Sequence, residues 1–543
     1  RRGRAARMAL GDELHVEIVP FGPSPRATRA AATAALDHPA VRAELGDANT
    51  RLLSAVAVAP RGDPGAEPDH VRATVYDYVN ERAVTVEAPI EGVTHVSVSS
   101  TVKQPLPSGE EFAAAVDAVT SDDTLGAAIG DGRLVAYRPM PPLVIEELED
   151  GRVERMIAVG LRPAGDNAQG HEIVAVKAAT GELRRFEGGA PPGAVARDEM
   201  CGLPDARQRT AERGEPGAAR ITVTRGGQLL WSFVAVRPAA STGTNGSGIE
   251  LRAVAYKGKR VLRRAHVPIL NVRYDRDACG PFRDWQWQEG MIQANGSDLA
   301  PGFRLCSEPA KTIFESGSDP GNFLGVAVYV DGDEVVLVSE LEAGWYRYIS
   351  LWRLAADGTI RPRFMFGAVE DSCVCNVHHH HVYWRFDFDV VTGAHNAVRE
   401  FNDPPLRGHT SNWHTLRHEI RRAKLPSRKR KWRVVNRVSG ESYTLIPGPE
   451  DGKRDSFGVG DLWALRHRHS AQIDDGVGFT TDPDEARAQL DKFINGQSIY
   501  DTDVVLWYSA HFSHDIRAQQ DAGDDHGHGH GHIVGPDLVP SGW

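Results

Sequence analysis

The feature that most constrains this chain is a run of four histidines that leads directly into an alternating segment, residues 378–389. After the histidines, aromatic and β-branched residues alternate with charged ones, which predicts a strand whose successive side chains point to opposite faces. In such a strand His378 and His380 share one face, and His379 and His381 share the other. Imidazole suits copper, zinc, iron or nickel. We therefore expect one of these pairs to bind a transition metal, and a third ligand must decide which.

The same segment carries two carboxylates, Asp387 and Asp389, which the alternation places on one face. Carboxylate oxygens are the ligands that calcium, magnesium and manganese prefer, so one strand is expected to serve two kinds of metal. A second apolar, β-rich run covers residues 500–514 and ends in His511 and His514. Either of these histidines could supply the third imidazole.

Together these segments resemble the copper-containing primary amine oxidases of the topaquinone type. Members of that family carry a His-x-His strand followed by Arg-x-Asp-x-Asp, which matches residues 385–389 here. They also carry a later Asp-(Ile/Val)-Val-Leu-Trp-Tyr strand, which matches residues 503–508. Aligned in this way, the resemblance implies that His378, His380 and His514 bind copper. Three neutral imidazoles leave coordination positions for water or dioxygen, as a catalytic site requires.

The resemblance also implies a peripheral calcium or manganese site, which we expect to be structural. Its ligands would be Asp387, Asp389 and Asp503, together with backbone carbonyls near Phe388 and Val504. Carboxylates clustered beside a hydrophobic strand repel one another, and a divalent ion removes that cost.

The family's cofactor, topaquinone, is made from one tyrosine by copper and dioxygen within a Thr-x-x-Asn-Tyr-(Asp/Glu)-Tyr motif. The matching segment is 341–350, which places the precursor at Tyr346. The chain departs from the motif on both sides, because Trp345 replaces the asparagine and Arg347 replaces the acidic residue. In the family the asparagine helps to hold the quinone in its productive orientation. Two alternatives stay open: Tyr346 becomes topaquinone, or it remains a plain tyrosine beside copper.

The resemblance further implies a tyrosine that hydrogen-bonds the quinone and a carboxylate that takes the α-proton from the substrate. Tyr274 matches the tyrosine, and Asp284 is the carboxylate nearest to the base position, with Glu289 as the alternative. A buried carboxyl group whose pKa is raised toward neutrality suits such proton abstraction. Both acids could equally be surface charges in a tryptophan-rich loop.

The implied reaction is the oxidation of a small primary amine by dioxygen, which yields an aldehyde, ammonia and hydrogen peroxide. The quinone carries the electron chemistry, while the protein supplies orientation, the base and the metal ligands. The alternative is a copper-binding protein of the same fold that lacks the quinone and performs a different dioxygen-dependent oxidation or no catalysis.

Composition limits the remaining possibilities. The chain has 543 residues, which suggests two to four domains. Its net charge of −11 argues against a nucleic-acid partner, and the absence of a run of eighteen apolar residues argues against a membrane span. No signal sequence is visible in a chain that begins at Arg1 without a methionine. We expect a soluble protein, and secreted, periplasmic and cytoplasmic locations all stay open.

The order of segments predicts a mainly β fold with α+β parts: two small α+β domains that precede a large antiparallel β-sandwich. Residues 1–12 form a basic tail, 13–97 and 98–187 are the small domains, 188–217 is a Gly/Pro/Arg-rich linker, and 218–543 is the copper-binding catalytic domain. Family members form homodimers through the large domain, and we expect the same here.

Within the small domains, two helices are indicated. The stretch 26–45 is amphipathic, and Ser108 is an N-cap signal for a helix over 109–119.

The cysteine count is odd and low for a disulfide-built scaffold. We expect buried thiols first, one disulfide second and a metal site third. The five residues are Cys201, Cys279, Cys306, Cys373 and Cys375.

A histidine–glycine repeat occupies residues 526–532, directly after Asp524 and Asp525 and shortly after the predicted third copper ligand. Such a repeat binds divalent copper, nickel or zinc readily. It could gather copper for the nearby site, or it could be a loop with adventitious affinity.

Overall fold

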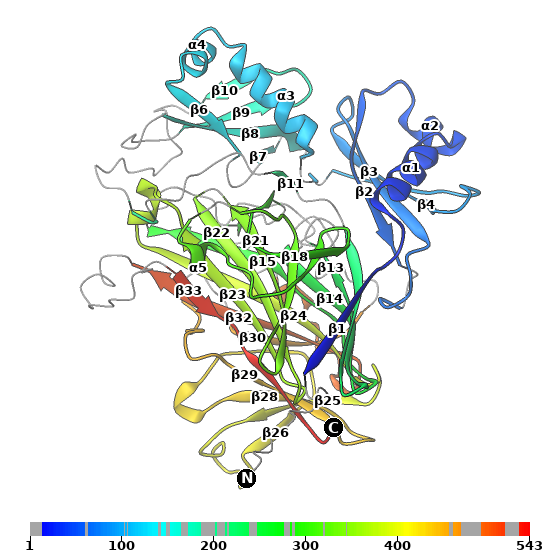
Figure 1. Cartoon of the computed structure of the whole chain (residues 1–543), viewed down its shortest axis with the longest axis vertical. Coiled ribbons are helices and arrows are strands. Elements are labelled where there is room, and N and C mark those ends of the chain that lie inside the picture. The colour runs from blue at the N-terminus through cyan, green and yellow to red at the C-terminus, as the bar shows by residue number, and fades with distance from the viewer. Residues whose placement is uncertain are drawn as a thin grey trace, which may run out of the picture.

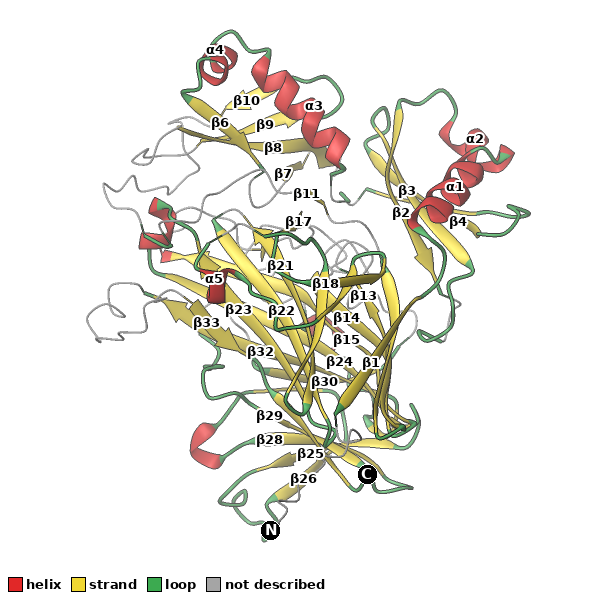
Figure 2. Cartoon of the chain, in the orientation of Figure 1, coloured by secondary structure: helices red, strands yellow, loops and turns green. Residues whose placement is uncertain are grey.

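The chain folds into a large β body that carries two small α+β units at one end (Figure 1). Strands predominate, and the longer helices lie in the small units (Figure 2). This arrangement confirms the predicted fold class. The computed structural model describes residues 13–59, 63–102, 104–105, 107–138, 143–147, 153–163, 172–185, 201–203, 212–213, 217–237, 247–275, 283–284, 288–318, 321–343, 345–455, 460–468, 490–515 and 531–543.

The first large sheet is antiparallel, and its strands follow the order β1-β12-β13-β14-β15-β24-β32-β30-β27. Its strands are β1 (Leu14–Pro20), β12 (Ala218–Arg225), β13 (Gln228–Val236), β14 (Ser247–Tyr256), β15 (Lys259–Tyr274), β24 (His378–Val391), β32 (Val504–His514), β30 (Leu462–Arg466), β27 (Ile420–Arg422) and the short β16 (Arg283–Asp284), which pairs with β15.

The second large sheet follows the order β18-β19-β20-β21-β22-β23-β34-β29-β28-β25-β26 and is antiparallel except between β19 and β20. Its strands are β18 (Gly296–Ala300), β19 (Phe303–Cys306), β20 (Val326–Asp331), β21 (Glu334–Ala343), β22 (Tyr346–Ala355), β23 (Ile360–Ala368), β34 (Asp537–Ser541), β29 (Ser442–Ile446), β28 (Lys431–Asn436), β25 (Asn396–Phe401) and β26 (Trp413–Leu416). The strands β11 (Glu212–Arg213), β17 (Gln288–Glu289), β31 (Tyr500–Thr502) and β33 (Gly531–Val534) attach at its side, and the short helices are α5 (Ile313–Ser316), η3 (Ser372–Cys375), η4 (Pro426–Arg428) and η5 (Asp491–Phe493).

The histidine strand predicted from the sequence is β24, which lies inside the first sheet and is buried on both faces. Its even-numbered residues, such as Trp384 and Phe386, belong to the core cluster shared by the two large sheets. Its odd-numbered Tyr383 packs instead with Trp463 and Trp507 in a separate cluster. Alternation along one strand therefore sends neighbouring side chains into two different environments.

The first small unit is a sheet in the order β2-β3-β4-β5 with α1 packed against it. Ser24 caps α1 by accepting from the backbone N–H of Ala27, and Pro25 opens the helix. The elements are α1 (Pro25–Leu36), α2 (Pro39–Leu45), β2 (Thr50–Val58), β3 (His70–Asp77), β4 (Arg82–Pro89) and β5 (Ser97–Thr101).

The first strand of the predicted small domain 13–97 belongs to the large body instead. The strand β1 pairs along its whole length with β12 of the first large sheet, because its buried residues Val16 and Ile18 join the core of that sheet. The sequence around β1 carries the same alternation in either setting, so the pattern alone does not select its partner.

The second small unit places α3 against a sheet in the order β10-β9-β8-β6, with β7 beside β8. The predicted helix over 109–119 is confirmed, and Ser108 and Glu111 form a reciprocal capping box at its start. The elements are α3 (Gly109–Thr120), α4 (Leu125–Gly130), β6 (Leu134–Tyr137), β7 (Leu143–Glu147), β8 (Val153–Pro163), β9 (Glu172–Lys177) and β10 (Leu183–Arg185).

A buried ion pair lies within the second small unit, and a hydrogen bond from Tyr78 links it to the first. Arg155 donates two hydrogen bonds of 2.7 Å to Glu111, which also accepts from the hydroxyl of Tyr78 at 2.6 Å. We expect Arg155→Met to lower the free energy of unfolding of this part of the chain by about 3–5 kcal/mol, because it leaves a buried carboxylate without its cation. Urea unfolding measures this, with Arg133→Met as control, since Arg133 pairs with Asp131 at the surface. Equal effects of the two substitutions would contradict the assignment.

A disulfide joins Cys201 to Cys375, so the expectation of buried thiols is wrong for these two residues. The bond connects Cys201, in the predicted linker 188–217, to Cys375 in the turn that precedes β24. Most of that linker, and also Cys279, lies outside the described residues. Cys306 is a buried free thiol, as expected. In the described helices, no segment has the length and apolar character that crossing a membrane would need.

Candidate functional site

Strand register in the first sheet positions the candidate site. Tyr274 of β15, His378 of β24 and His514 of β32 are paired in one row across the sheet. Two residues along β24, His380 pairs with Phe512 of β32. Residues in register on adjacent strands project to the same face, so these side chains face the second large sheet together.

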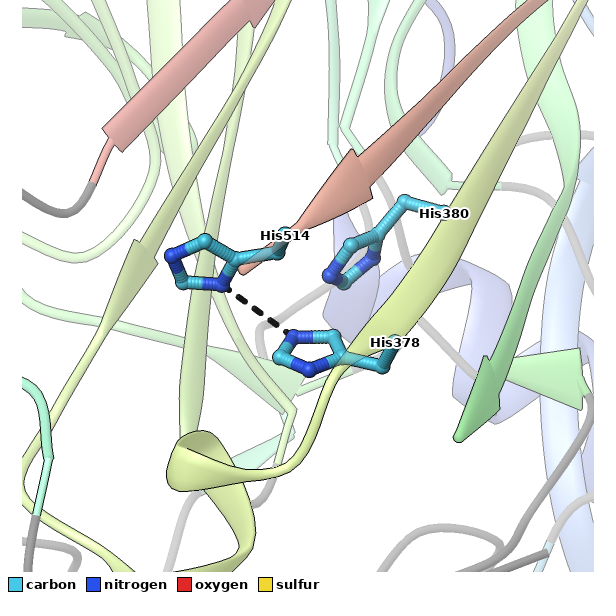
Figure 3. A group of neighbouring side chains, drawn as sticks. All are labelled: His378, His380 and His514. Atoms are coloured by element: carbon cyan, nitrogen blue, oxygen red, sulfur yellow. Dashed lines mark hydrogen bonds between the residues drawn. The ribbon is translucent and has the colours of Figure 1, made fainter. Parts of the chain in front are cut away.

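The imidazoles of His378, His380 and His514 point toward one another (Figure 3). One ring nitrogen from each lies within 4.8 Å of the others, a spacing that a single metal ion can bridge. The three residues are 0%, 1% and 1% exposed. The structure thus brings together the three histidines that the sequence analysis selected.

The other histidine pair lies on the opposite face of β24 and has different neighbours. Nε2 of His381 lies 3.0 and 3.1 Å from the carboxylate oxygens of Asp455, and the same carboxylate is 3.7 Å from His379. His511, the alternative third ligand, contacts Asp461 at 3.0 Å. Among the described residues, these side chains do not form a group of three donors within reach of one ion.

Burial keeps His378 and His380 neutral. It lowers the pKa of His378 to about 4 and holds the pKa of His380 well below its usual range. Nδ1 of His378 lies 2.6 Å from the carbonyl oxygen of Asn376. Because a carbonyl oxygen only accepts, Nδ1 carries the proton and Nε2 presents a lone pair. Neutral imidazoles with a free lone pair are the form that binds metal.

His380 gives the most direct sign that the cluster fits a metal. Neither of its ring nitrogens has a hydrogen-bond partner, although the residue is buried. Its ring packs against Phe366 at 4.7 Å and Phe512 at 5.0 Å between centroids, and these rings offer no polar partner. An unpartnered buried polar atom costs about 1–3 kcal/mol, and a bond from one ring nitrogen to a metal removes part of that cost. Three imidazoles in a dry site suit copper.

Tyr346, the predicted cofactor precursor, reaches the same cluster from the second large sheet. Its phenolic oxygen lies 2.5 Å from Nε2 of His378 and 2.6 Å from Nδ1 of His514. Its ring stands edge-on to His380, with centroids 4.9 Å apart. The phenolic oxygen therefore lies where it can bind, or react beside, a metal held by the three imidazoles.

Trp345, which the sequence resemblance aligns with the family's asparagine, contacts a predicted partner of the cofactor. Its indole N–H donates a 2.7 Å hydrogen bond to the hydroxyl of Tyr274. The ring of Tyr274 stacks on His378, with centroids 4.6 Å apart. The hydroxyl that we expected beside the quinone thus bonds to the indole in this structure.

Arg347, which the sequence resemblance aligns with the family's acidic residue, is fully buried. Its guanidinium lies 3.3 Å from the carboxylate of Glu342, its register partner on β21, and donates to the carbonyl of Tyr346 at 3.1 Å. The charge introduced after Tyr346 is therefore balanced across the strand pair.

Of the two candidate bases, the structure describes the side chain of Glu289 but only the backbone of Asp284. The backbone of Asp284 pairs with Leu270 of β15, which pairs in turn with Val382 of β24, but the side chain of Asp284 lies outside the described part. Glu289 is buried and forms an ion pair with Arg237. Burial raises the pKa of Glu289 even though Arg237 opposes the shift. No described contact links Glu289 to the histidine cluster.

A second donor group lies farther along β24, on its odd-numbered face. Asp387, His467 and Asp503 each offer one atom within 4.8 Å of the others, and Nδ1 of His467 lies 3.1 Å from Asp387. Phe388 pairs with Val504, which brings Asp503 beside Asp387. Ligation by the backbone carbonyls of Phe388 and Val504 stays a prediction.

Asp389 completes a space that fits a cation. A Cβ built on Gly393 would lie 2.9 Å from Oδ1 of Asp389 and 3.3 Å from Oδ2 of Asp503, so both carboxylates close on this glycine. One oxygen of Asp387, of Asp389 and of Asp503 is buried without a hydrogen-bond partner. These oxygens suit calcium or manganese, and the imidazole of His467 moves the donor set toward manganese.

The carboxylates of this group predict a pH-dependent stability in the metal-free protein. Burial and the charge of Asp387 raise the pKa of Asp389 to about 6 and that of Asp503 to about 7. Because these pKa values are raised in the folded state, the two protonated carboxyl groups make a contribution to the free energy of unfolding that is fully present below about pH 4. That contribution is lost as the pH rises through 6 and 7. Added manganese should restore it at neutral pH, where the carboxylates ionise and bind. Urea unfolding with and without the ion measures both effects.

Asp503→Asn should remove the contribution of Asp503 to the pH dependence and weaken the response to manganese. Asp501→Asn is the control, because Asp501 is half-exposed and pairs with His395 and Arg437 instead. An unchanged manganese response in Asp503→Asn would contradict the site.

His467 is the candidate ligand that the sequence analysis missed. It follows β30 between two arginines, with no spacing that relates it to the carboxylates of β24. Only the pairing of β30 with β32 brings it near Asp503, since the backbone N–H of His467 donates to the carbonyl of Asp503 at 3.1 Å.

Solved structures with the same fold include amine and lysyl oxidases. A copper-containing benzylamine oxidase from Hansenula polymorpha aligns with 96% of this chain and 98% of its own, at a TM-score of 0.61 and 13% identity. An Aspergillus nidulans amine oxidase aligns over 98% and 89% at 0.53 and 12%, and the lysyl oxidase of Pichia pastoris over 91% and 86% at 0.52 and 11%. No protein-family model and no curated sequence matches the chain. The chain therefore has the amine oxidase fold.

Proposed function

We propose that this protein is a copper-dependent oxidase that converts a primary amine, dioxygen and water to an aldehyde, ammonia and hydrogen peroxide. His378, His380 and His514 would hold the copper. Tyr346 would be the precursor of a topaquinone, which when formed supplies a reactive carbonyl and accepts two electrons from the substrate.

A single observation carries the proposal: the phenolic oxygen of Tyr346 lies within 2.6 Å of ring nitrogens of two of the three candidate copper ligands. Oxidation of a tyrosine by copper and dioxygen requires the phenol to be next to the metal, and proximity of this kind is the main contribution that a protein scaffold makes. The shared fold with amine oxidases supports the same function.

The remaining residues would act on the substrate. Asp284 would take the α-proton of the amine, with its backbone two strands from β24, and a carboxyl group with a raised pKa would suit that step. Tyr274, stacked on His378, would hold the cofactor's position through its hydroxyl. The apolar walls formed by Phe366 and Phe512 would exclude water from the copper side.

A second function is favoured by one specific contact. Because Trp345 already donates to Tyr274, the cofactor's expected partner has another bond, and Tyr346 could stay an unmodified phenol on copper. The protein would then be a copper-binding protein of the amine oxidase fold with a different dioxygen-dependent oxidation or no catalysis.

Phenylhydrazine titration of the copper-loaded protein separates the two functions. The amine oxidase should be pink, react with phenylhydrazine at one site per chain and release hydrogen peroxide when given primary amines. A colourless protein that holds copper but does not react supports the second function. A protein that binds no copper refutes both.

We further propose a homodimer and, at the second donor group, manganese or calcium. The Cys201–Cys375 disulfide supports an oxidising compartment, in which such bonds persist.

A further inference from the structure

The candidate copper cluster is sealed from solvent, which raises the question of how copper reaches it. His378, His380 and His514 are at most 1% exposed, and so is Tyr346. A hydrated copper ion has to exchange its water ligands for protein donors before it can enter a dry cluster. A partly exposed donor next to the cluster would meet this need.

His532 is such a donor, and it comes from the last position of the histidine–glycine repeat. It lies on β33, where its register partner on β23 is Phe366. Its ring centroid is 5.2 Å from that of His514, compared with 4.9 Å between His378 and His514. Among these four histidines, only His532 is partly exposed.

The surroundings of His532 lead inward to the cluster. Its ring packs on Phe512 with centroids 4.5 Å apart, and the other neighbour of Phe512 is His380, stacked at 5.0 Å. The ring thus stands between solvent and the cluster, in contact with two residues that line it.

We propose that His532 is a copper-loading ligand, which binds a copper ion from solution and passes it to His514 and then to the full set of three imidazoles. The step is an exchange of imidazole ligands on copper with no change of oxidation state. This inference rests on the proposed copper site. It adds His532 as a transient ligand and a path for copper entry, neither of which is part of the proposed permanent ligand set.

Copper uptake by the metal-free protein tests the proposal without any substrate. Copper is removed with a chelator, cupric ion alone is added, and tryptophan fluorescence follows loading. Copper content and the electron paramagnetic resonance spectrum are measured at the end. The variants are His532→Ala, His530→Ala from the same repeat and His380→Ala from the cluster, with circular dichroism to show that each is folded.

We expect His532→Ala to load roughly tenfold more slowly than the wild type, which corresponds to about 1.4 kcal/mol in the barrier. Its final copper content and spectrum should equal those of the wild type, and His530→Ala should load at the wild-type rate. An unchanged rate in His532→Ala overturns the proposal. An equal delay in His530→Ala also overturns it, in favour of loose chelation by the repeat. An altered final spectrum overturns it in favour of a permanent ligand.

His380→Ala keeps the two proposals separable. If His380→Ala and the wild type take up the same amount of copper, the cluster itself is not the copper site. The proposed function then fails together with the loading route. If only His380→Ala loses copper while His532→Ala loads normally, the function stands and the loading route fails.

Discussion

Replacing His380 by alanine should abolish tight copper binding. The side chain offers two unpartnered ring nitrogens in a buried cluster, and the cluster has few other donors. Residues that only support a metal ligand already cost about 10–100-fold in affinity when they are lost, so loss of a direct ligand should cost at least roughly 100-fold. Atomic absorption of protein dialysed against a weak chelator measures this, and oxidase activity should fall to background with the copper.

His379→Ala is the matched control, since it removes the adjacent imidazole on the opposite face of the same strand. His379 contacts Ser513 and Asp275 rather than the cluster. It should keep the wild-type copper content. If His380→Ala retained its copper and His379→Ala lost it, the metal would belong to the other face of β24.

Replacing Tyr346 by phenylalanine should leave copper bound and abolish the reaction with phenylhydrazine. Phenylalanine keeps the ring that packs edge-on to His380 but lacks the oxygen that contacts His378 and His514. Without a phenol no quinone can form, so amine-dependent release of hydrogen peroxide should fall to the level of copper-free protein. Absorbance after phenylhydrazine addition and a peroxidase-coupled assay measure the two losses.

Tyr348→Phe is the control for this change. Tyr348 lies two residues along β22, stacks on Tyr346 at 5.6 Å and belongs to the same buried core. It should keep the copper, the colour and the activity. Hydrazine reactivity that survives in Tyr346→Phe would show that the cofactor comes from another residue.

Much of the candidate copper cluster was predictable from the sequence because it depends on strand periodicity. Alternation along β24 places His378 and His380 on one face, and the apolar pattern of β32 indicates a neighbouring strand that ends in His514. The same periodicity fixes the side on which Asp387 and Asp389 lie. Two strands with strong patterns and a register set by burial leave few other arrangements.

Contacts that depend on tertiary pairing were not predictable. The strand β1 alternates equally well in a small unit or in the large sheet. His467 and His532 reach their sites only through the pairings of β30 with β32 and of β33 with β23. Likewise, the substitution at Trp345 was visible in the sequence, whereas its bond to Tyr274 requires the β22 end to face β15.

Crystals of the copper-loaded protein, measured with X-rays on both sides of the copper absorption edge, test the central claim most directly. Anomalous difference density should show one copper ion per chain between the ring nitrogens of His378, His380 and His514, beside the oxygen of Tyr346. Density elsewhere, with these three imidazoles unligated, would contradict the account.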